Sequence, residues 1–406
     1  MRTSFENAKN ATIKLLEYCQ EYDWTGYDPY DALNSKIFKG LSFLDFRLPR
    51  LVLTQMLKKS PVNLRLMLLI PKTQNPKAIA LFLMAFLKLS RLGLLDRKGL
   101  VTMMVERLVA GRSPNTPYWC WGYSFPWQTR THVVPRQAPN LVCTTFVANA
   151  LLDAYDMNPE PRYLSMAASA AEYILHELYW TEDDFTAGFS YPFPLVHTRV
   201  HNANFLGAAL FCRIYKHSGE KKFLEPALKV VRYSASKQHD DGSWDYGELS
   251  TQRWADNFHT GYNLGALRSI GHYAETLEFE PHIRRGFEFY RKSFFMGNGA
   301  PKYFYNRAYP IDIHCVAQSI ITLLELSDLD EGNVDLAHSV FGWAMNQMWD
   351  ERGYFYYQIL PYYTNKISYM RWSQAWMLLA LSTLLEDCNQ SLTGTRCNTA
   401  SALARS

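Results

Sequence analysis

The sequence lacks the cysteine patterns of cross-linked or zinc-binding proteins. Its seven Cys residues are scattered and odd in number, and no two of them form a Cys-x-x-Cys pair. This argues against a disulfide framework and against a thiolate metal site. Long apolar runs are also missing, since the longest uninterrupted one, residues 78–87, is too short to span a bilayer. The first twenty residues lack the apolar stretch of a signal peptide, so we expect a cytoplasmic protein.

Charge is sparse and unevenly distributed. Charged residues make up 20% of the chain and hydrophobic residues 48%, values typical of a folded globular protein. The net charge is only +4, but residues 47–112 hold 13 Lys or Arg against Asp96 and Glu106, a net charge of +11, which leaves −7 for the rest. This segment predicts a contact with an anionic membrane surface or with a glycosyltransferase. Solvated faces of core-packed helices are the simpler alternative. No aromatic residues alternate with the basic ones, so we expect no nucleic-acid binding.

What the sequence does contain is a motif that returns at a nearly constant interval. Its starts are separated by 58, 55 and 57 residues and lie at His201, His259, His314 and Arg371. Thr144, another 57 residues upstream, fits the same phase. At each start an aromatic, polar loop runs into an apolar helix. A fixed period of this length predicts a repeated supersecondary unit, with the first turns of the helices gathered at one end of the molecule.

Helical periodicity extends over almost the whole chain. The predicted helices are 4–21, 48–59, 75–93, 97–111, 142–156, 161–178, 199–217, 221–237, 259–276, 280–295, 312–326, 334–349 and 369–386. Helices rich in Ala, Gly and Leu alternate with helices that have one charged face, which is typical of inner and outer layers. About six such pairs predict an all-α (α/α)6 toroid, a six-hairpin barrel, with short β-hairpin loops at its mouth.

The expected domain organisation follows from this map. Residues 113–390 would form the repeat toroid with an active cleft, and the basic helical segment 1–112 would complete the ring. Residues 391–406 are expected to be a disordered tail.

Aromatic residues, 15% of the chain, concentrate in the loops between the predicted helices. Sugar rings stack their C–H faces on Trp and Tyr, while their hydroxyl groups need convergent polar partners. The loops therefore predict a polysaccharide or oligosaccharide substrate. The aromatic residues predicted to bind it are Trp121, Trp244, Trp254 and Trp372. The alternative for each ring is that it closes a hydrophobic seam.

Polar residues are densest around residues 254–263. His259 and Tyr262 are three residues apart and so share a helix face, and His201 and Asn204 repeat that spacing one hairpin earlier. Such a set can abstract a proton next to a carboxylate. The predicted catalytic residues are His259, Tyr262, Asp256, His201 and Asp312. The polar residues predicted to bind substrate are Asn204, Asn257, His314, Arg371 and Gln374, of which Arg371 could hold a carboxylate bidentately.

Two other chemistries are open. Glycoside hydrolysis needs a pair of carboxylates, for which Asp256 and Asp312 are the candidates. Asp312 could instead be a helix N-cap. Metal binding by the three repeat-phase His residues lacks a local ligand spacing, so we predict no metal and no cofactor. Each His could also be a helix-start residue bonded to a neighbouring loop.

Two motifs carry resemblances. Residues 238–244, Gln-His-Asp-Asp-Gly-Ser-Trp, resemble the Gln-x-x-Asp-Gly-Ser-Trp repeat of terpene cyclase-like and sugar-active α/α toroids. Residues 256–263 together with 369–376 resemble toroid proteins associated with bacterial exopolysaccharide and capsule biosynthesis. The acidic triplet of protonating terpene cyclases is absent, which disfavours an isoprenoid cyclase.

The Asn-His-Tyr grouping is more distantly similar to toroidal polysaccharide lyases and to the helical domain of glucuronyl C5-epimerases. That resemblance implies that Asn257 or Asn204 neutralises a uronate, that His259 is the base, and that Tyr262 is the acid or second base. We therefore expect an enzyme of bacterial polysaccharide metabolism that abstracts a proton from a uronic acid, as a lyase or C5-epimerase. A glycoside hydrolase and a non-catalytic glycan-binding assembly subunit are the alternatives.

Overall fold

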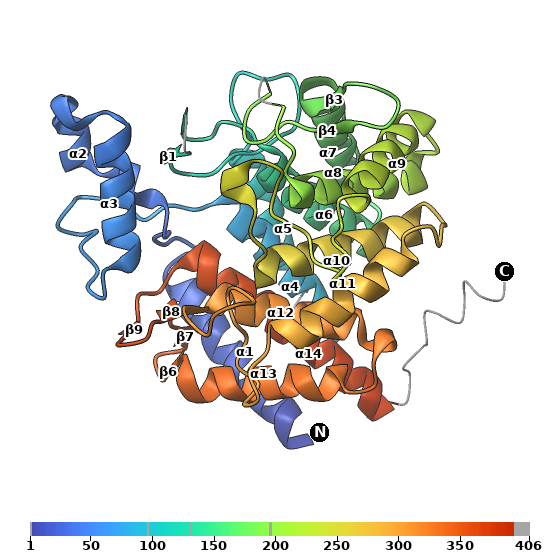
Figure 1. Cartoon of the computed structure of the whole chain (residues 1–406). Helices are drawn as coiled ribbons and strands as arrows, with labels where there is room; N and C mark the ends of the chain where they lie inside the picture. Colours follow the sequence, from blue (N-terminus) through green and yellow to red (C-terminus); the bar gives the residue numbers. More distant parts are fainter. Residues whose placement is uncertain (1, 96, 130–131, 195–196, 394–406) are drawn as a thin grey trace.

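The computed structural model describes residues 2–95, 97–129, 132–194 and 197–393, and helices dominate it (Figure 1). The α-helices are α1 Arg2–Glu21, α2 Lys36–Gly40, α3 Arg47–Lys59, α4 Pro76–Arg91, α5 Arg97–Ala110, α6 Leu141–Met157, α7 Pro161–Tyr173, α8 His201–Ser218, α9 Lys221–Ala235, α10 Asn257–Tyr273, α11 Glu280–Ser293, α12 Ile313–Glu325, α13 Asn333–Gln347 and α14 Trp376–Thr393. A π-helix, Met370–Ala375, leads directly into α14.

The helices form two concentric layers. Within the described residues, six inner helices pack each against the next in the order α4, α6, α8, α10, α12 and α14, and α14 closes the ring on α4. The outer helices α5, α7, α9, α11 and α13 each pack on the inner helix that precedes them, and α1 packs on α14. The two ends of the chain thus supply the sixth hairpin, and the predicted (α/α)6 toroid is confirmed.

The sequence of each layer explains its position. The inner helix α4 is apolar on all sides, with Ile79, Phe82 and Phe86 all buried, because it contacts neighbours on several faces. The outer helix α11 buries Ile283, Phe287 and Tyr290 on one face, and the opposite face is charged.

Polar N-caps fix where four inner helices begin. The side chains of Asn75, Asn140, Asp256 and Asp312 each accept a hydrogen bond from a main-chain N–H of the helix that follows, at 2.9 to 3.0 Å. These bonds satisfy helix N–H groups that have no partner within the helix. The N-cap alternative for Asp312 is therefore confirmed, and Asp256 has the same role.

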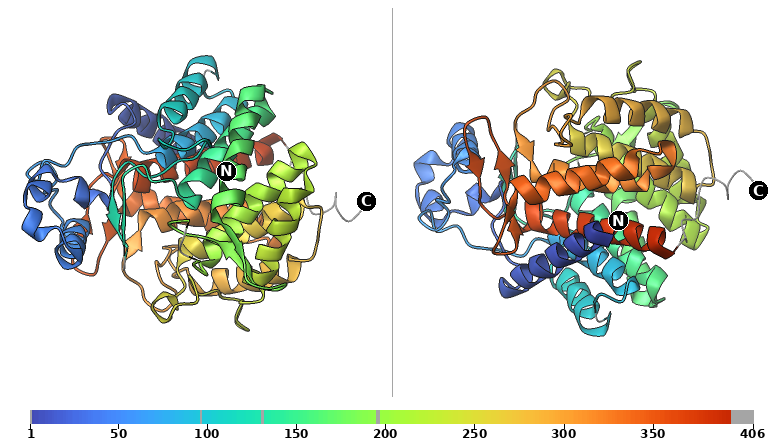
Figure 2. Two further views of the ribbon diagram at one scale, coloured as in Figure 1. Left: turned by 90° about the horizontal axis from the view of Figure 1, so that it is seen from above. Right: turned by 90° about the horizontal axis from the view of Figure 1, so that it is seen from below.

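Short antiparallel strands lie in the loops that lead into the inner helices, as predicted. They are β1 Trp127–Gln128, β2 Val133–Val134, β3 Tyr179–Thr181, β4 Ala187–Phe189, β5 Ile311–Asp312, β6 Trp349–Asp350, β7 Tyr354–Phe355, β8 Gln358–Ile359 and β9 Thr364–Asn365. β1 pairs with β2, β3 with β4 and β6 with β7, while β5, β8 and β9 form a three-stranded sheet. The inner helices α6, α8, α12 and α14 begin after such loops, so these strands gather at the end of the toroid where the inner helices start, here named the loop end (Figure 2).

Residues 22–75, here named the projecting segment, join α1 to α4. Trp24 near their start packs on Phe82 and Phe86 of α4, and the part that includes α2 and α3 projects from the loop end (Figures 1 and 2). This part has a small core of its own, formed by Ala32, Leu57 and Ile70. Helices α1, α4 and α5 from the same basic segment 1–112 take places in the ring, while the expected domain boundaries at residues 112 and 390 stay predictions. Residues 394–406 of the expected tail lie outside the described residues.

A buried ion pair joins this projecting segment to the last inner helix. Arg371 Nε and Nη2 bind the two carboxylate oxygens of Asp28 at 2.6 and 2.8 Å, and both side chains are about 6% exposed. Next to it, Arg65 binds Asp31 at 2.8 Å and the carbonyl oxygen of Asp28 at 2.8 Å. Across the described ranges, no helix combines the length and the hydropathy needed to cross a membrane.

We expect the substitution Arg371→Met to lower the free energy of unfolding by about 3–5 kcal/mol, because it leaves the Asp28 carboxylate buried without its cation. Urea denaturation followed by circular dichroism measures this. In the double variant Asp28→Leu/Arg371→Met both charges leave together, so much of the loss should be recovered. A double variant as unstable as the single one would contradict this role of the pair.

Candidate functional site

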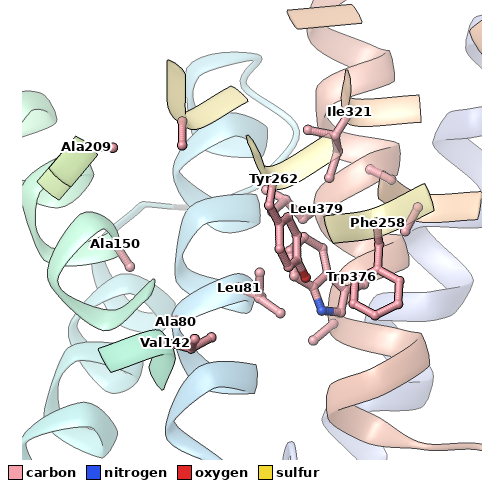
Figure 3. Packing of buried hydrophobic residues seen from close by; sticks show 14 of the residues in the cluster. Ala80, Leu81, Val142, Ala150, Ala209, Phe258, Tyr262, Ile321, Trp376 and Leu379 are labelled. Atoms are coloured by element: carbon pink, nitrogen blue, oxygen red, sulfur yellow. The ribbon is translucent and has the colours of Figure 1, made fainter. Parts of the chain in front are cut away.

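The first turns of the inner helices bring their side chains together at the loop end. Tyr262 of α10 stacks on Trp376 at the start of α14, with ring centroids 5.6 Å apart, and lies 5.8 Å from the ring of Phe258. Figure 3 shows these three residues packed together in the interior of the ring, beside Leu81 of α4. The prediction that the repeat phase gathers side chains at one end is therefore confirmed for α10 and α14.

His259 and Asp256 form an oriented pair. His259 Nδ1 lies 3.0 and 2.9 Å from the two carboxylate oxygens of Asp256, and the same carboxylate caps α10 through the main-chain N–H of His259. A carboxylate accepts hydrogen bonds, so Nδ1 donates and Nε2 is left as the proton acceptor. The imidazole keeps 20% of its surface exposed, while the Asp256 side chain is fully buried. This is the arrangement in which an acid orients a histidine base.

Tyr262 and His314 form a second pair. The Tyr262 hydroxyl lies 2.6 Å from His314 Nε2. Burial, together with the positive charges of Lys77 and Arg371, lowers the pKa of His314 well below its ordinary value, so its imidazole is neutral near pH 7. Burial raises the pKa of Tyr262, so the phenol stays protonated. The pair can therefore exchange a proton without either group being charged at the outset.

Lys77, in the first turn of α4, is a functional candidate that the sequence analysis missed. Its ammonium lies 3.9 Å from the ring centroid of Phe146 and about 5 Å from those of Tyr262 and Trp376. Burial and the nearby charge of Arg371 lower its pKa well below the ordinary value. Among the described residues the ammonium forms no ion pair and no hydrogen bond, and the Asp28 carboxylate, which Arg371 already binds, offsets the lowering only in part. The available signal was a lysine directly before the apolar run 78–87.

Half-buried aromatic residues from several loops surround His259. Tyr246 and Trp254 stack on each other at 4.5 Å and lie 4.8 and 5.9 Å from the His259 ring. Burial raises the pKa of Tyr246 and of Tyr303, and Tyr30 on the projecting segment is close enough to raise both further. The half-buried rings of this group, here named the aromatic shell, are Tyr30, Tyr123, Tyr191, Tyr246, Trp254 and Tyr303.

Several predicted site residues instead fasten the loops to the ring. Asn204 accepts a hydrogen bond from the main-chain N–H of Phe189 at 2.9 Å, and Gln374 bonds both main-chain groups of Phe355 at 2.9 Å. Thr144 binds the main-chain N–H of Trp121 in the same way, at 3.1 Å. At these positions the repeat phase therefore reflects loop anchoring, which needs a polar side chain early in an inner helix.

His201 and Asn257 point toward neighbouring helices. His201 is 2% exposed, and its Nδ1 lies 3.3 Å from the Ser234 hydroxyl of α9. Burial lowers its pKa to about 4. Asn257 is fully buried and bonds Ser319 and Tyr290. The structure does not bring either residue to the His259 pair.

The four predicted tryptophans divide into two kinds. The indole N–H of Trp121 donates to the Leu108 carbonyl at 2.7 Å and that of Trp244 to the Ser234 carbonyl at 3.1 Å, and both rings are at most 2% exposed. These two close hydrophobic seams. Trp254 lies beside His259, and Trp372 lies 4.6 Å from His314, so both belong to the loop-end group.

Two predicted site residues bind other residues of the chain where a substrate was expected. Arg371 holds a carboxylate bidentately, but that carboxylate is Asp28. Asp312 has no exposed surface and accepts hydrogen bonds from His314 N, Trp372 Nε1 and Gln358 Nε2 at 2.7 to 2.9 Å. Burial raises its pKa to about 6. In the described ranges, no three His, Cys, Asp or Glu side chains are grouped closely enough to hold a metal ion.

Tyr262 and Trp376 of this group also line a cavity, and a second cavity shares no residue with the group. One, of about 350 Å³, runs between the inner helices beyond Tyr262 and Trp376, where it meets Gln318, Arg213 and Glu325 in the later turns. Since the inner helices begin at the loop end, that cavity faces the opposite end. The other, of about 370 Å³, has Tyr22, Lys72, Arg352 and Lys366 among its lining residues.

Comparison with known proteins identifies the fold. No family model matches the chain, and no curated protein matches it. Among similar solved structures are an unsaturated glucuronyl hydrolase from Streptococcus agalactiae (10% identity, TM-score 0.61, 95% of this chain and 93% of that one) and a family 76 α-mannanase from Bacteroides thetaiotaomicron (13%, 0.58, 78% and 88%). A cellobiose 2-epimerase from Bacillus thermoamylovorans is also similar (10%, 0.56, 79% and 90%). The chain therefore has the (α/α)6 toroid fold that these carbohydrate enzymes share.

Proposed function

We propose that this chain is a carbohydrate-active enzyme that abstracts a proton from a sugar ring carbon, with His259 as the base. The observation that carries the proposal is the His259–Asp256 pair, in which Nδ1 is held by the carboxylate and Nε2 is available within the aromatic shell. Tyr246 and Trp254 offer stacking surfaces beside it. The similar structures include an epimerase and hydrolases of sugars, which fits a glycan substrate.

The substrate class that fits best is a uronic acid within an acidic bacterial polysaccharide. Lys77 is a buried ammonium without a direct ion pair of its own, because Asp28 is bound by Arg371, and a uronate carboxylate would supply one. Lys77 thereby takes the role expected of Arg371, which is occupied by Asp28. Pairing would also stabilise the enolate-like charge that forms when the proton next to the carboxylate leaves.

The reaction balances without a co-reactant. His259 Nε2 takes the proton from C5, and the electron pair is delocalised into the carboxylate. In epimerisation the Tyr262 hydroxyl, backed by His314, returns a proton to the opposite face of C5. In elimination the electron pair forms the C4–C5 double bond, the C4–O bond breaks, and the departing oxygen takes the proton of the Tyr262 hydroxyl.

Glycoside hydrolysis by Asp256 and Asp312 is the second candidate, favoured by the hydrolases among the similar structures. It needs two carboxylates about 5–10 Å apart with free oxygens. Asp312 is sealed by three donors, and Asp256 binds His259. The geometry therefore supports proton abstraction better.

The test is incubation with a panel of acidic and neutral bacterial polysaccharides in heavy water. We expect either absorbance of an unsaturated uronate or deuterium at C5 without cleavage. His259→Gln should lower the rate by about 10²–10⁴-fold, the usual contribution of a general base. The matched control His201→Gln, at the same repeat phase, should keep the activity of the folded protein.

Each other outcome of this panel rejects the proposal. New reducing ends without deuterium or absorbance would establish a hydrolase. Binding without any signal that differs between the native protein and His259→Gln would establish a glycan-binding protein.

We expect the substitution Lys77→Met to have opposite effects on stability and on glycan binding. Removing this buried ammonium should raise the free energy of unfolding at pH 7, because its desolvation cost disappears, while weakening binding of acidic glycans. Because the folded-state pKa of Lys77 lies below its unfolded value, the unfolded chain binds the extra proton and native stability rises with pH toward about 10.4. The variant should lack that rise. Thermal unfolding between pH 7 and 10 measures the difference, and a destabilised variant with the native pH slope would contradict the assignment.

A further inference from the structure

The projecting segment exposes a concentration of large apolar side chains. Eleven of the nineteen exposed large hydrophobic residues of the described chain lie between residues 37 and 69. They are Ile37, Leu41, Phe43, Phe46, Leu48, Val52, Met56, Val62, Leu66, Met67 and Leu69, here named the apolar face. Single exposed hydrophobic residues are ordinary, but a group of this size in one small segment marks an interaction surface.

The apolar face is built from three successive pieces of chain. Leu48, Val52 and Met56 are spaced four residues apart and so line one side of α3. The turn before α3 adds Phe43 and Phe46, and the loop after it adds Leu66, Met67 and Leu69. Phe43, Leu66 and Met67 each keep more than 70% of their surface exposed, so they protrude.

The opposite side of the segment is fixed to the toroid. Leu57, on the other side of α3, is fully buried with Ala32 and Ile70. The buried Asp28–Arg371 pair and a 2.9 Å hydrogen bond from Asn365 Nδ2 to the Ser60 carbonyl hold it at the loop end. The apolar side chains therefore face outward in a set orientation, away from the small core.

The positive charge around the apolar face indicates which kind of partner it fits. Residues 36–72 contain eight Lys or Arg and only Asp45 as an acid, a net charge of +7. Five of these cations are exposed, namely Lys36, Lys39, Arg47, Lys59 and Lys72. Apolar side chains that enter the acyl boundary, next to cations that reach phosphate groups, match an anionic lipid surface. A second copy of the chain would set +7 against +7, which opposes self-association through this face.

We propose that the apolar face docks on an anionic membrane surface, which places the loop end of the toroid toward the lipid headgroups. The proposed contact therefore differs from the one expected over residues 47–112: it begins earlier, at residue 36, and ends at residue 72, because α4 and α5 are part of the ring. This inference does not depend on the reaction carried out at His259.

Vesicle sedimentation with the full chain tests it. The protein should bind vesicles of phosphatidylcholine with about one third phosphatidylglycerol, bind pure phosphatidylcholine vesicles far more weakly, and dissociate as salt rises. The variant Phe43→Ser/Phe46→Ser/Met67→Ser, which changes exposed side chains alone, should bind at least about tenfold more weakly. The matched control Phe185→Ser/Leu249→Ser/Leu277→Ser, at exposed apolar positions elsewhere, should bind like the native protein.

Three results would overturn the proposal: no binding to the anionic vesicles, equal binding of the triple variant and the native chain, or equal binding to neutral vesicles. Analytical ultracentrifugation gives a fourth. A native dimer that the Phe43/Phe46/Met67 variant converts to a monomer, without vesicle binding by either, would assign the face to self-association.

Discussion

The buried ion pair between Asp28 and Arg371 is the constraint on which the loop end depends. The toroid closes by bringing together α1 and α14 from the two ends of the chain, and this pair joins the loop after α1 to the start of the last inner helix. The same ion pair positions Tyr30 within the aromatic shell, near Tyr246. It also fixes the projecting segment, which has the apolar face on its outer side. A bidentate carboxylate–guanidinium contact suits this task, because it fixes orientation as well as distance. It also withdraws Arg371 from substrate binding.

The fold could be predicted from the sequence because it depends on local periodicity. Amphipathic and fully apolar helices alternate at a fixed spacing, and only a two-layer ring of hairpins buries both kinds. The site could be predicted only in part. Thr144 shares the repeat phase of His259, and Asn204 and Gln374 share that of Tyr262, but all three bond loop main chain. Spacing alone cannot distinguish a residue that anchors a loop from one that takes part in chemistry. Lys77 was missed because its contacts with Phe146 and Trp376 join residues remote in sequence.

Buried polar side chains that already have all their hydrogen-bond partners within the protein are not available for chemistry. Asp312 is sealed by three hydrogen-bond donors, and Asp256 divides its oxygens between the cap of α10 and the His259 ring. What is left at the loop end is an oriented imidazole, a neutral Tyr262–His314 pair and an unpaired ammonium. Those groups move protons and bind an anion. Two free carboxylates across a sugar, which hydrolysis requires, are not provided by the pair predicted for it.

The most direct test of this account is a crystal structure of the His259→Gln variant with a bound acidic oligosaccharide, since the variant should bind without turning over. The account predicts a uronate stacked on Tyr246 or Trp254, its carboxylate within reach of Lys77 and its C5 next to residue 259. An oligosaccharide found instead in the axial cavity beside Glu325, or against Tyr22 and Lys366, would contradict the assignment of the loop end as the active site.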